Sequence, residues 1–202
     1  ALKDDMAKVL DSAAGNACTG ADLVAVNVST ASINLQSAGT ASATATANLS
    51  LANWRSLADD ARKKNIPFYD GSSYVVVGSV ALLSGLHSDA ATAGFVDVSK
   101  YTDAYAARNF TGELGRIYFG RFVEETNFFS NTIGSGSVYG SGVLLGNDAV
   151  MEGIAVPEEI RANVPKDFGR DQRLAWYYLG GFQKIWNQVT DVSERVYYIT
   201  SL

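Results

Sequence analysis

Two consecutive apolar runs constrain the fold of this chain more than any other feature. Residues 74–79 read YVVVGS and lie between turn-forming residues, a pattern typical of a strand buried inside a sheet. Residues 80–89, VALLSGLHSD, follow at once, and we predict a short helix on which Val80, Leu83 and His87 align. A strand followed directly by a helix indicates an α+β or α/β layer.

The N-terminal part predicts a helix and then a strand. Residues 2–10 carry apolar side chains at helical spacing, and Gly15 and Asn16 are expected to end this helix. Valines alternate along residues 22–29, DLVAVNVS, as they do in a strand. The Ala-, Ser- and Thr-rich residues 29–48 fit either a surface loop or extended structure with small side chains, and we favour a loop with some extended pairing.

A second helix is predicted after Ser50, which is a good N-cap residue. Arginine and lysine near its end suit the helix dipole, and Asn65 and Pro67 are expected to end it. The residues expected on its buried face are Leu51, Trp54, Leu57, Ala58 and Ala61.

The second half of the chain is rich in strand signals. Residues 110–129, FTGELGRIYFGRFVEETNFF, predict two strands joined by a glycine-containing turn. Residues 131–142 are predicted to form a glycine- and serine-rich loop, and residues 143–150, VLLGNDAV, a buried strand and a turn. Residues 88–109 are predicted to form a surface connection, and residues 157–169, PEEIRANVPKDFG, a charged link. Residues 170–202 are aromatic and β-prone.

One glycine pair is expected to disturb this last segment. Gly180 and Gly181 would break or bulge a long strand, since glycine weakens strand interiors.

Composition excludes several functions. Lys plus Arg number 16 and Asp plus Glu 21, so the net charge of −5 argues against a dedicated nucleic-acid binder. One cysteine, Cys18, and one histidine, His87, leave no disulfide framework and no thiolate metal cluster. No apolar run of about 18 residues is present, so no membrane-spanning helix is predicted.

The conspicuous stretch at residues 110–129 invites two chemical interpretations. Its glycines match neither the dinucleotide fingerprint nor a P-loop, and they more readily serve turns and close packing. Glu113, Glu124 and Glu125 resemble an acid/base set, but adjacent strand residues point to opposite faces. Ion pairs with Arg116 and Arg121 across the hairpin are the commoner outcome for such glutamates.

The remaining candidates also favour a structural role. His87 near Asp89 lacks a nucleophile motif, and Cys18 is expected to be a small buried side chain. The aromatic set of the C-terminal part fits stacking on sugars or bases, but equally fits buried packing and subunit contact: Trp176, Tyr177, Tyr178, Phe182 and Trp186. We therefore predict no catalytic, cofactor-binding or metal-ligating residue.

The order of these motifs resembles the major capsid (coat) proteins of tailed bacteriophages. The resemblance begins with residues 49–86 and is most specific in FTGELGRIYFGRFVEETN at residues 110–127. VYGSGVLLGNDAV follows, and then a spaced set made of Trp176, Gly181, Ile185 and Asn187. The resemblance covers most of the chain from about Leu49 onward.

The resemblance implies the α+β Hong Kong 97-type capsid fold. That fold has an axial domain with a central sheet and flanking helices, and a peripheral domain with a long helix and long strands. Residues 1–48 would hold the end of the spine helix, a peripheral strand and the Ala/Ser/Thr-rich loop, residues 49–150 the axial domain, and residues 151–202 the return to the peripheral domain. The family's N-terminal arm and extended loop do not precede Ala1, so we expect a longer gene product.

The resemblance also implies a function. The chain would be a non-enzymatic structural subunit of an icosahedral phage head, assembled in the host bacterial cytoplasm into pentamers and hexamers that enclose the DNA genome. Its partners would be copies of itself, other capsid, scaffold, decoration or portal proteins, and packaged double-stranded DNA through non-specific contact, with no cofactor and no membrane. The alternative is a β-rich tail, decoration or adhesion module that binds a receptor or glycan.

Ten residues are predicted to mark the fold or contact other subunits. They are Gly112, Glu113, Gly115, Arg116, Arg121, Glu124, Glu125, Trp176, Tyr178 and Trp186.

Overall fold

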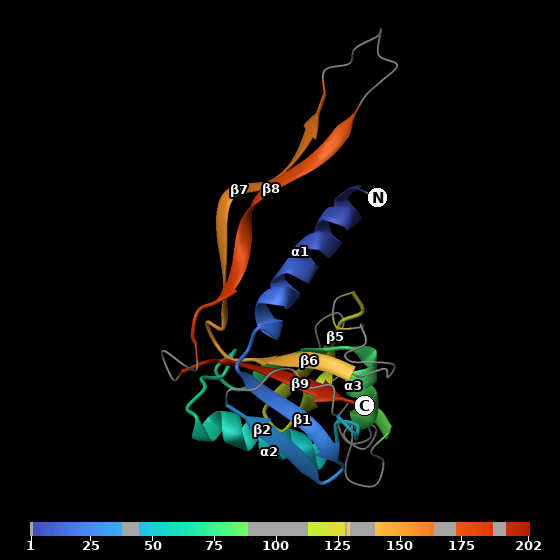
Figure 1. The fold of residues 1–202 in the computed structure, drawn as a ribbon, viewed down its shortest axis with the longest axis vertical. Coiled ribbons are helices and arrows are strands. Elements are labelled where there is room, and N and C mark those ends of the chain that lie inside the picture. The colour runs from blue at the N-terminus through green and yellow to red at the C-terminus, as the bar shows by residue number, and fades with distance from the viewer. Residues whose placement is uncertain are drawn as a thin grey trace.

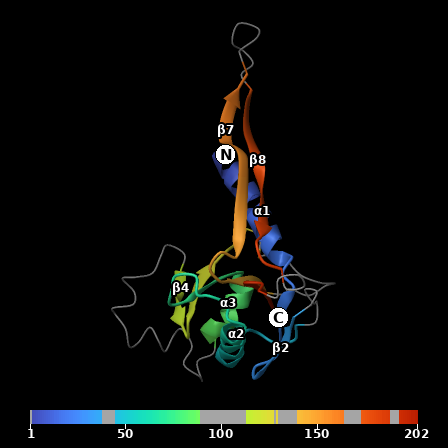
Figure 2. The ribbon, with the colours of Figure 1, turned by 90° about the vertical axis from the view of Figure 1, so that its left-hand side faces the viewer.

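The computed structural model describes residues 2–37, 45–88, 113–127, 129, 140–163, 173–187 and 193–202. The helices and strands are α1 (Leu2–Thr19), β1 (Leu23–Ser29), β2 (Ser32–Gln36), α2 (Leu51–Lys63), β3 (Tyr74–Gly78), α3 (Val80–Ser88), β4 (Glu113–Ile117), β5 (Gly120–Glu124), β6 (Gly140–Leu145), β7 (Val150–Ala162), β8 (Leu174–Lys184) and β9 (Val196–Ser201). Figure 1 shows two parts, which we call the body (β1–β6, β9, α2 and α3) and the arm (α1, β7 and β8). Figure 2 shows the same separation from the side.

A seven-stranded mixed sheet organises the body. Its strand order is β2-β1-β9-β6-β3-β5-β4, with parallel pairs β1–β9 and β3–β5 and the other neighbours antiparallel. Strand β3 lies inside this sheet, which confirms the prediction of a buried strand at residues 74–79.

Helix α2 covers one face of the sheet much as its sequence predicts. The Ser50 side chain accepts a hydrogen bond of 3.1 Å from the backbone N–H of Asn53 and so caps the helix. Trp54, Leu57 and the other predicted apolar residues are buried against the strands. This half of the core is continuous from α2 to α3.

Helix α3 presents a different face from the predicted one. Leu82, Leu83 and Leu86 are buried, whereas Val80 is 50% exposed. The hydroxyl of Ser79 accepts a bond from the N–H of Leu82, and this cap fixes the rotation with which the helix leaves β3. The side chain of His87 lies outside the part of the chain that the structure describes.

The C-terminal end of α1 covers the opposite face of the sheet. Cys18 and Ala21 are buried there with Val143 and Tyr198. The predicted stop at Gly15 and Asn16 is wrong, because α1 continues to Thr19. Gly15 is buried within the helix and lines a hollow of about 210 Å³ between α1 and the sheet, so it does not act as a helix stop.

Strands β1 and β2 confirm two N-terminal predictions. β1 covers the alternating valines, and β2 supplies the extended pairing expected within residues 29–48. β1 is buried on both faces from Leu23 to Asn27: Leu23 and Ala25 pack in the core with α2, whereas Val24 and Val26 are buried with Ala45 on the other face. Residues 38–44 and the predicted connection at 89–109 lie outside the described residues.

The charged link predicted from Pro157 onward is partly wrong, since residues 157–162 belong to β7. Proline is tolerated because β7 is an edge strand and its register shifts between Val156 and Glu159. Gly180 and Gly181 do not interrupt β8. The bulge beside them lies on β7, in the register shift that follows Ile154.

The body sheet draws strands from all three predicted segments: β1 and β2 from 1–48, β3–β6 from 49–150, and β9 from 151–202. The assignment of these segments to axial and peripheral domains stays a prediction. Among the described helices, none combines the length and the apolar character needed to cross a membrane.

Candidate assembly surfaces

The tip of the β4–β5 hairpin is made by two aromatic residues. Ile117 pairs with Gly120, so Tyr118 and Phe119 form a two-residue turn, with φ of 40° and 62°. This positive-φ pair is the backbone of a type I′ turn, which normally takes Asn or Gly. The prediction of a glycine at the turn is therefore wrong, and holding two bulky residues there costs about 1–3 kcal/mol each.

Gly120 instead allows a close approach of β5 to α2. A Cβ atom at this position would lie 2.3 Å from the indole of Trp54. The Trp54 Nε1–H donates to the carbonyls of Ile117 and Tyr118 at 3.0 and 3.1 Å. These hydrogen bonds hold the turn against α2. The other predicted glycine, Gly115, has φ of 147° and sits at a bulge in β4.

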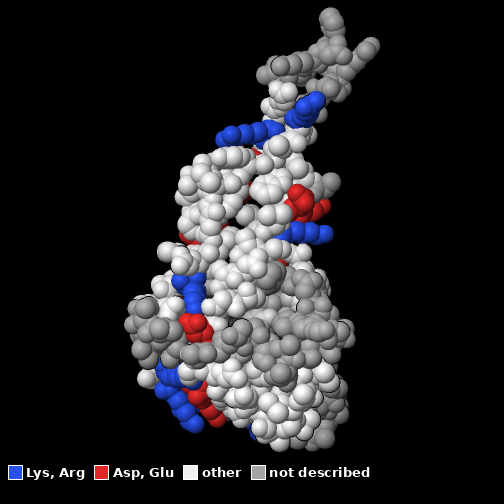
Figure 3. All heavy atoms as spheres, in the orientation of Figure 1, with Lys and Arg blue, Asp and Glu red and all other residues white. Residues whose placement is uncertain are grey.

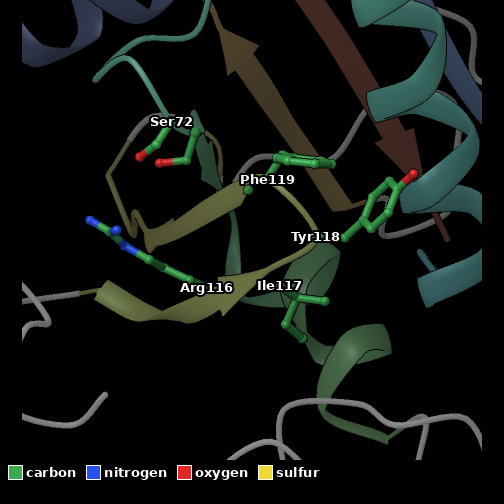
Figure 4. A pocket seen from close by; sticks show the side chains of 7 residues that line it. Ser72, Arg116, Ile117, Tyr118 and Phe119 are labelled. Atoms are coloured by element: carbon green, nitrogen blue, oxygen red, sulfur yellow. The ribbon is translucent and has the colours of Figure 1, made fainter. Parts of the chain in front are cut away.

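The two rings lie at the surface beside arginines of α2. Arg55 lies over the Tyr118 ring and Arg62 over the Phe119 ring, 5.7 and 4.7 Å from their centroids. The Tyr118 hydroxyl donates to Asp59 at 2.7 Å. We call Tyr118, Phe119, Arg55 and Arg62 the aromatic tip. Figure 4 shows Tyr118 pointing toward α2, beside a hollow of about 240 Å³.

Arg116 and Arg121 face each other across the hairpin. Neither arginine therefore lies directly opposite a glutamate, and the predicted ion pairs with glutamates of this stretch stay a prediction. Both guanidinium groups instead reach the Asp70 carboxylate from the preceding turn, at 3.6 and 3.1 Å. Burial alone would raise the pKa of Asp70, but hydrogen bonds from Ser72, Ser73 and Arg121 hold it well below the usual range.

The glutamates of this stretch do not form one site. Glu124 ends β5, whereas Glu125 folds back and accepts backbone N–H groups of Asn127 and Phe129, the latter at 2.7 Å. Glu125 therefore caps a loop, a structural role. The side chain of Glu113 and all of Gly112 lie outside what the structure describes.

The predicted aromatic residues Trp176 and Tyr178 lie on one face of β8, Tyr177 lies on the other, and Trp186 lies at the base of the arm. Trp176 donates through Nε1 to Asp5 of α1 at 3.0 Å. Tyr178 donates through its hydroxyl to Glu152 of β7 at 3.1 Å, and Trp186 through Nε1 to the Asp148 carbonyl at 3.1 Å. These polar ends are engaged within the chain, which favours packing over free stacking platforms.

The arm exposes many large apolar side chains, unlike the body sheet. The exposed ones on β7, β8 and just after are Met151, Ile154, Ile160, Leu174, Tyr177, Leu179 and Ile185. Figure 3 shows charged groups on the arm separated by wide uncharged surface. The β7–β8 register places Met151, Tyr177 and Leu179 on one face of the hairpin and Ile154, Ile160 and Leu174 on the other. Exposed apolar side chains of this kind mark an interaction site. Of these residues, the sequence analysis had named only Tyr177 and Ile185.

A buried polar cluster joins the arm to the body. The Glu194 side chain is fully buried and accepts N–H groups of Asp22 at 3.0 Å and Leu23 at 3.2 Å. Lys184, at the end of β8, binds Glu194 at 2.9 Å, Asp22 at 3.2 Å and the Gly20 carbonyl at 2.8 Å. Burial opposes the charge of Lys184, but the hydrogen bonds that its ammonium group donates to Glu194 and Asp22 raise its pKa.

Cys18 borders an apolar hollow of about 210 Å³ between α1 and the sheet. Burial raises the pKa of its thiol to about 11, so the thiol stays protonated at neutral pH. This confirms the expectation of a small buried side chain. Among the described residues, no group of three or more metal-ligating side chains comes together.

No protein-family model and no curated protein matches this sequence. Two solved structures match its fold, both at 14% identity. One is the acidic stable capsid structure of Helicobacter pylori bacteriophage KHP30, with a TM-score of 0.53 over 77% of this chain and 58% of that chain. The other is the capsid asymmetric unit of cyanophage Pam1, with a TM-score of 0.54 over 99% of this chain and 64% of that chain.

The fold is thus similar to that of phage capsid chains, and this chain spans less than two thirds of the length of each. The predicted marker residues fall in two places. Those between Gly115 and Glu125 lie in the body, and Trp176, Tyr178 and Trp186 in the arm or at its base.

Proposed function

We propose that this chain is a structural subunit of an icosahedral bacteriophage head with a Hong Kong 97-type fold. The observation that carries the proposal is the likeness of its body and arm together to chains of two capsid structures. The subunits would assemble into pentamers and hexamers that enclose the genome, a non-enzymatic role in the virion. Assembly would take place in the host cytoplasm, with possible scaffold, decoration or portal partners and only non-specific contact with DNA.

The division into body and arm supports a domain proposal. The body would be the axial domain and the arm the peripheral domain, so β1, β2 and β9 would belong to the axial part. Marker residues on both parts, among them Arg121 and Trp176, would then shape two kinds of contact. Several moderate contacts per subunit stabilise a shell through multivalency, without tight pairwise affinity.

The exposed apolar surface of the arm also supports self-association. A two-stranded hairpin is marginally stable alone, and α1 covers one face of β8. Leu179 and Ile154 remain more than half exposed. A neighbouring subunit that covers them would stabilise the arm as well as the shell.

The test is negative-stain electron microscopy of the full-length gene product, expressed alone and with its phage neighbours. Rings, shells or sheets are the expected result. Monomers under both conditions would contradict the proposal. A glycan-array signal that is lost on Trp176→Ala would favour the alternative tail, decoration or adhesion module instead.

A further inference from the structure

The turn between β4 and β5 carries aromatic side chains in a backbone conformation that disfavours them. Two-residue turns of this type normally take Asn-Gly or Gly-Gly, which adopt positive φ without steric conflict. Tyr118 and Phe119 occupy the turn here, with φ of 40° and 62°. Smaller residues would join the strands with less strain, so the rings themselves are needed at this position.

Packing within the chain accounts for only part of each ring. Phe119 stacks on Phe68, with 5.6 Å between the centroids. Tyr118 and Phe119 are nevertheless 37% and 39% exposed, and the guanidinium groups of Arg55 and Arg62 lie over them. Tyrosine and arginine held rigidly at a surface are the residues that dominate binding energy at protein interfaces.

We infer that the aromatic tip binds the arm of a second copy of this chain, at the segment of β7 that contains Glu158 and Glu159. The inference rests on the proposed function, because a shell subunit binds its own copies. The inference names the two surfaces that meet, and it assigns arginine–carboxylate and apolar contacts between them.

Charge and polarity of the two surfaces are complementary. Strand β7 carries three glutamates and one arginine, and Glu158 and Glu159 are exposed, the latter beside Arg161, with which it pairs. Alternate strand residues share a face, so Ile160 lies on the same side of β7 as Glu158, and Glu159 lies on the other. Ile160 is 60% exposed and offers apolar area to the aromatic rings beside the Glu158 carboxylate. The tip supplies two guanidinium groups, from Arg55 and Arg62, which bind carboxylates in a directional manner.

The two surfaces cannot meet within one chain. The tip lies beside α2, which covers one face of the body sheet, whereas the arm leaves from the opposite face (Figure 1). Contact between different patches of identical chains is heterologous, and repeated rotation by such a contact closes a ring. The projecting arm gives each copy the reach to touch its neighbour (Figure 2).

The first test replaces the turn by residues suited to its backbone, Tyr118→Asn with Phe119→Gly. The thermal midpoint of the unassembled chain should change by less than about 5 °C, because relief of strain offsets the lost ring contacts. The protein concentration needed for particle formation should rise at least about tenfold, the effect of losing one interface hot spot. Val80→Ser, which changes an exposed residue of α3, is the control and should assemble like the parent.

The second test exchanges charge. Arg55→Glu with Arg62→Glu makes one variant, and Glu158→Arg with Glu159→Arg makes the other. Each variant alone should lose assembly, since its tip and arm then carry like charges. An equimolar mixture should form hexameric rings again, because the two variants can alternate around six positions and each tip then meets an arm of opposite charge; pentamers cannot alternate in this way. Light scattering and negative-stain microscopy of the full-length chain report both outcomes.

The results distinguish a failure of the tip–arm contact from a failure of the proposed function. Normal assembly of the Asn-Gly variant would overturn the inference and leave the proposed function intact. Loss in both charge variants without recovery in the mixture would overturn β7 as the partner of the tip. A parent that forms no particles with its phage neighbours would overturn the proposed function, and this inference with it.

Discussion

The body and the arm both contain large apolar side chains but place them in opposite ways. Trp54, Tyr74 and Phe122 of the body are fully buried. In the arm, Ile160 and Leu179 are more than half exposed. The body therefore has its own hydrophobic core, whereas the arm has too few layers to bury its apolar surface without a partner.

The difference separates two sources of stability. Burial of apolar area stabilises the body, at roughly 25 cal/mol per Å². The arm is held by polar links such as Trp176 to Asp5 and Lys184 to Glu194, at discrete points along α1 and the junction. Substitutions in the core of the body should therefore lower the free energy of unfolding most, whereas substitutions of exposed apolar residues of the arm should act mainly on assembly.

The largest effect is expected from Trp54→Ala in the body. This change removes a fully buried ring, its contact with Phe122 and its bonds to the hairpin turn. The free energy of unfolding should fall by about 4 kcal/mol. The matched substitution Trp176→Ala in the arm should cost about 1 kcal/mol, since that ring is only half-buried. Equal losses in denaturant titrations of the two variants would remove the distinction between body and arm.

A smaller but still large effect is expected from Glu194→Gln at the junction. The amide leaves the Lys184 ammonium without its buried carboxylate, so the free energy of unfolding should fall by about 3 kcal/mol. Amide hydrogen exchange should rise first in α1 and β8, which meet at this cluster. Glu159→Gln, on the exposed surface of β7, is the control and should change stability by less than about 0.5 kcal/mol. Unchanged exchange in the arm would show that Lys184 does not fix it to the body.

Local chemistry made the body largely predictable from sequence. The cap at Ser50, the apolar face of α2 and the breaker-bounded strand at residues 74–79 each follow from neighbouring residues. The errors arose where a residue that is distant in the sequence determines the local structure. Gly15 is buried and lies inside α1 and does not end it, and Gly120 is required by Trp54 and not by the turn.

The arm and the junction were harder to predict for the same reason. Pro157 and its charged neighbours suggest a link, and only an edge strand with a shifted register accommodates them. Lys184, Asp22 and Glu194 are distant in sequence, so no local pattern unites them. The family resemblance did anticipate long strands beside a long helix, and β7, β8 and α1 have that arrangement.

A pH-dependent effect of intermediate size is expected in the body at Asp70. Its pKa is lowered in the folded chain, so its stabilising effect is present above the unfolded pKa near 4 and is lost as pH falls through the lower folded pKa. Asp70→Asn should cost about 2 kcal/mol at neutral pH, because Arg116 and Arg121 then face each other without that carboxylate. Between pH 5 and pH 2, the free energy of unfolding of the parent should fall by about 2 kcal/mol more than that of the variant. Parallel curves for parent and variant would contradict this role.

The smallest effect on folding, combined with a large effect on assembly, is expected from Leu179→Ser in the arm. Leu179 is 52% exposed, so the free energy of unfolding of the unassembled chain should change by less than about 0.5 kcal/mol. The same exchange at the fully buried Leu144 of the body should cost at least about 3 kcal/mol, which tests the contrast with one chemistry at two sites. If a neighbouring copy covers the arm, Leu179→Ser should still weaken particle formation measured by light scattering, because a hydroxyl replaces apolar area that assembly would bury. A variant that folds and assembles like the parent would mean that this face of the arm stays in solvent in the particle, and the apolar surface of the arm would then need a different explanation.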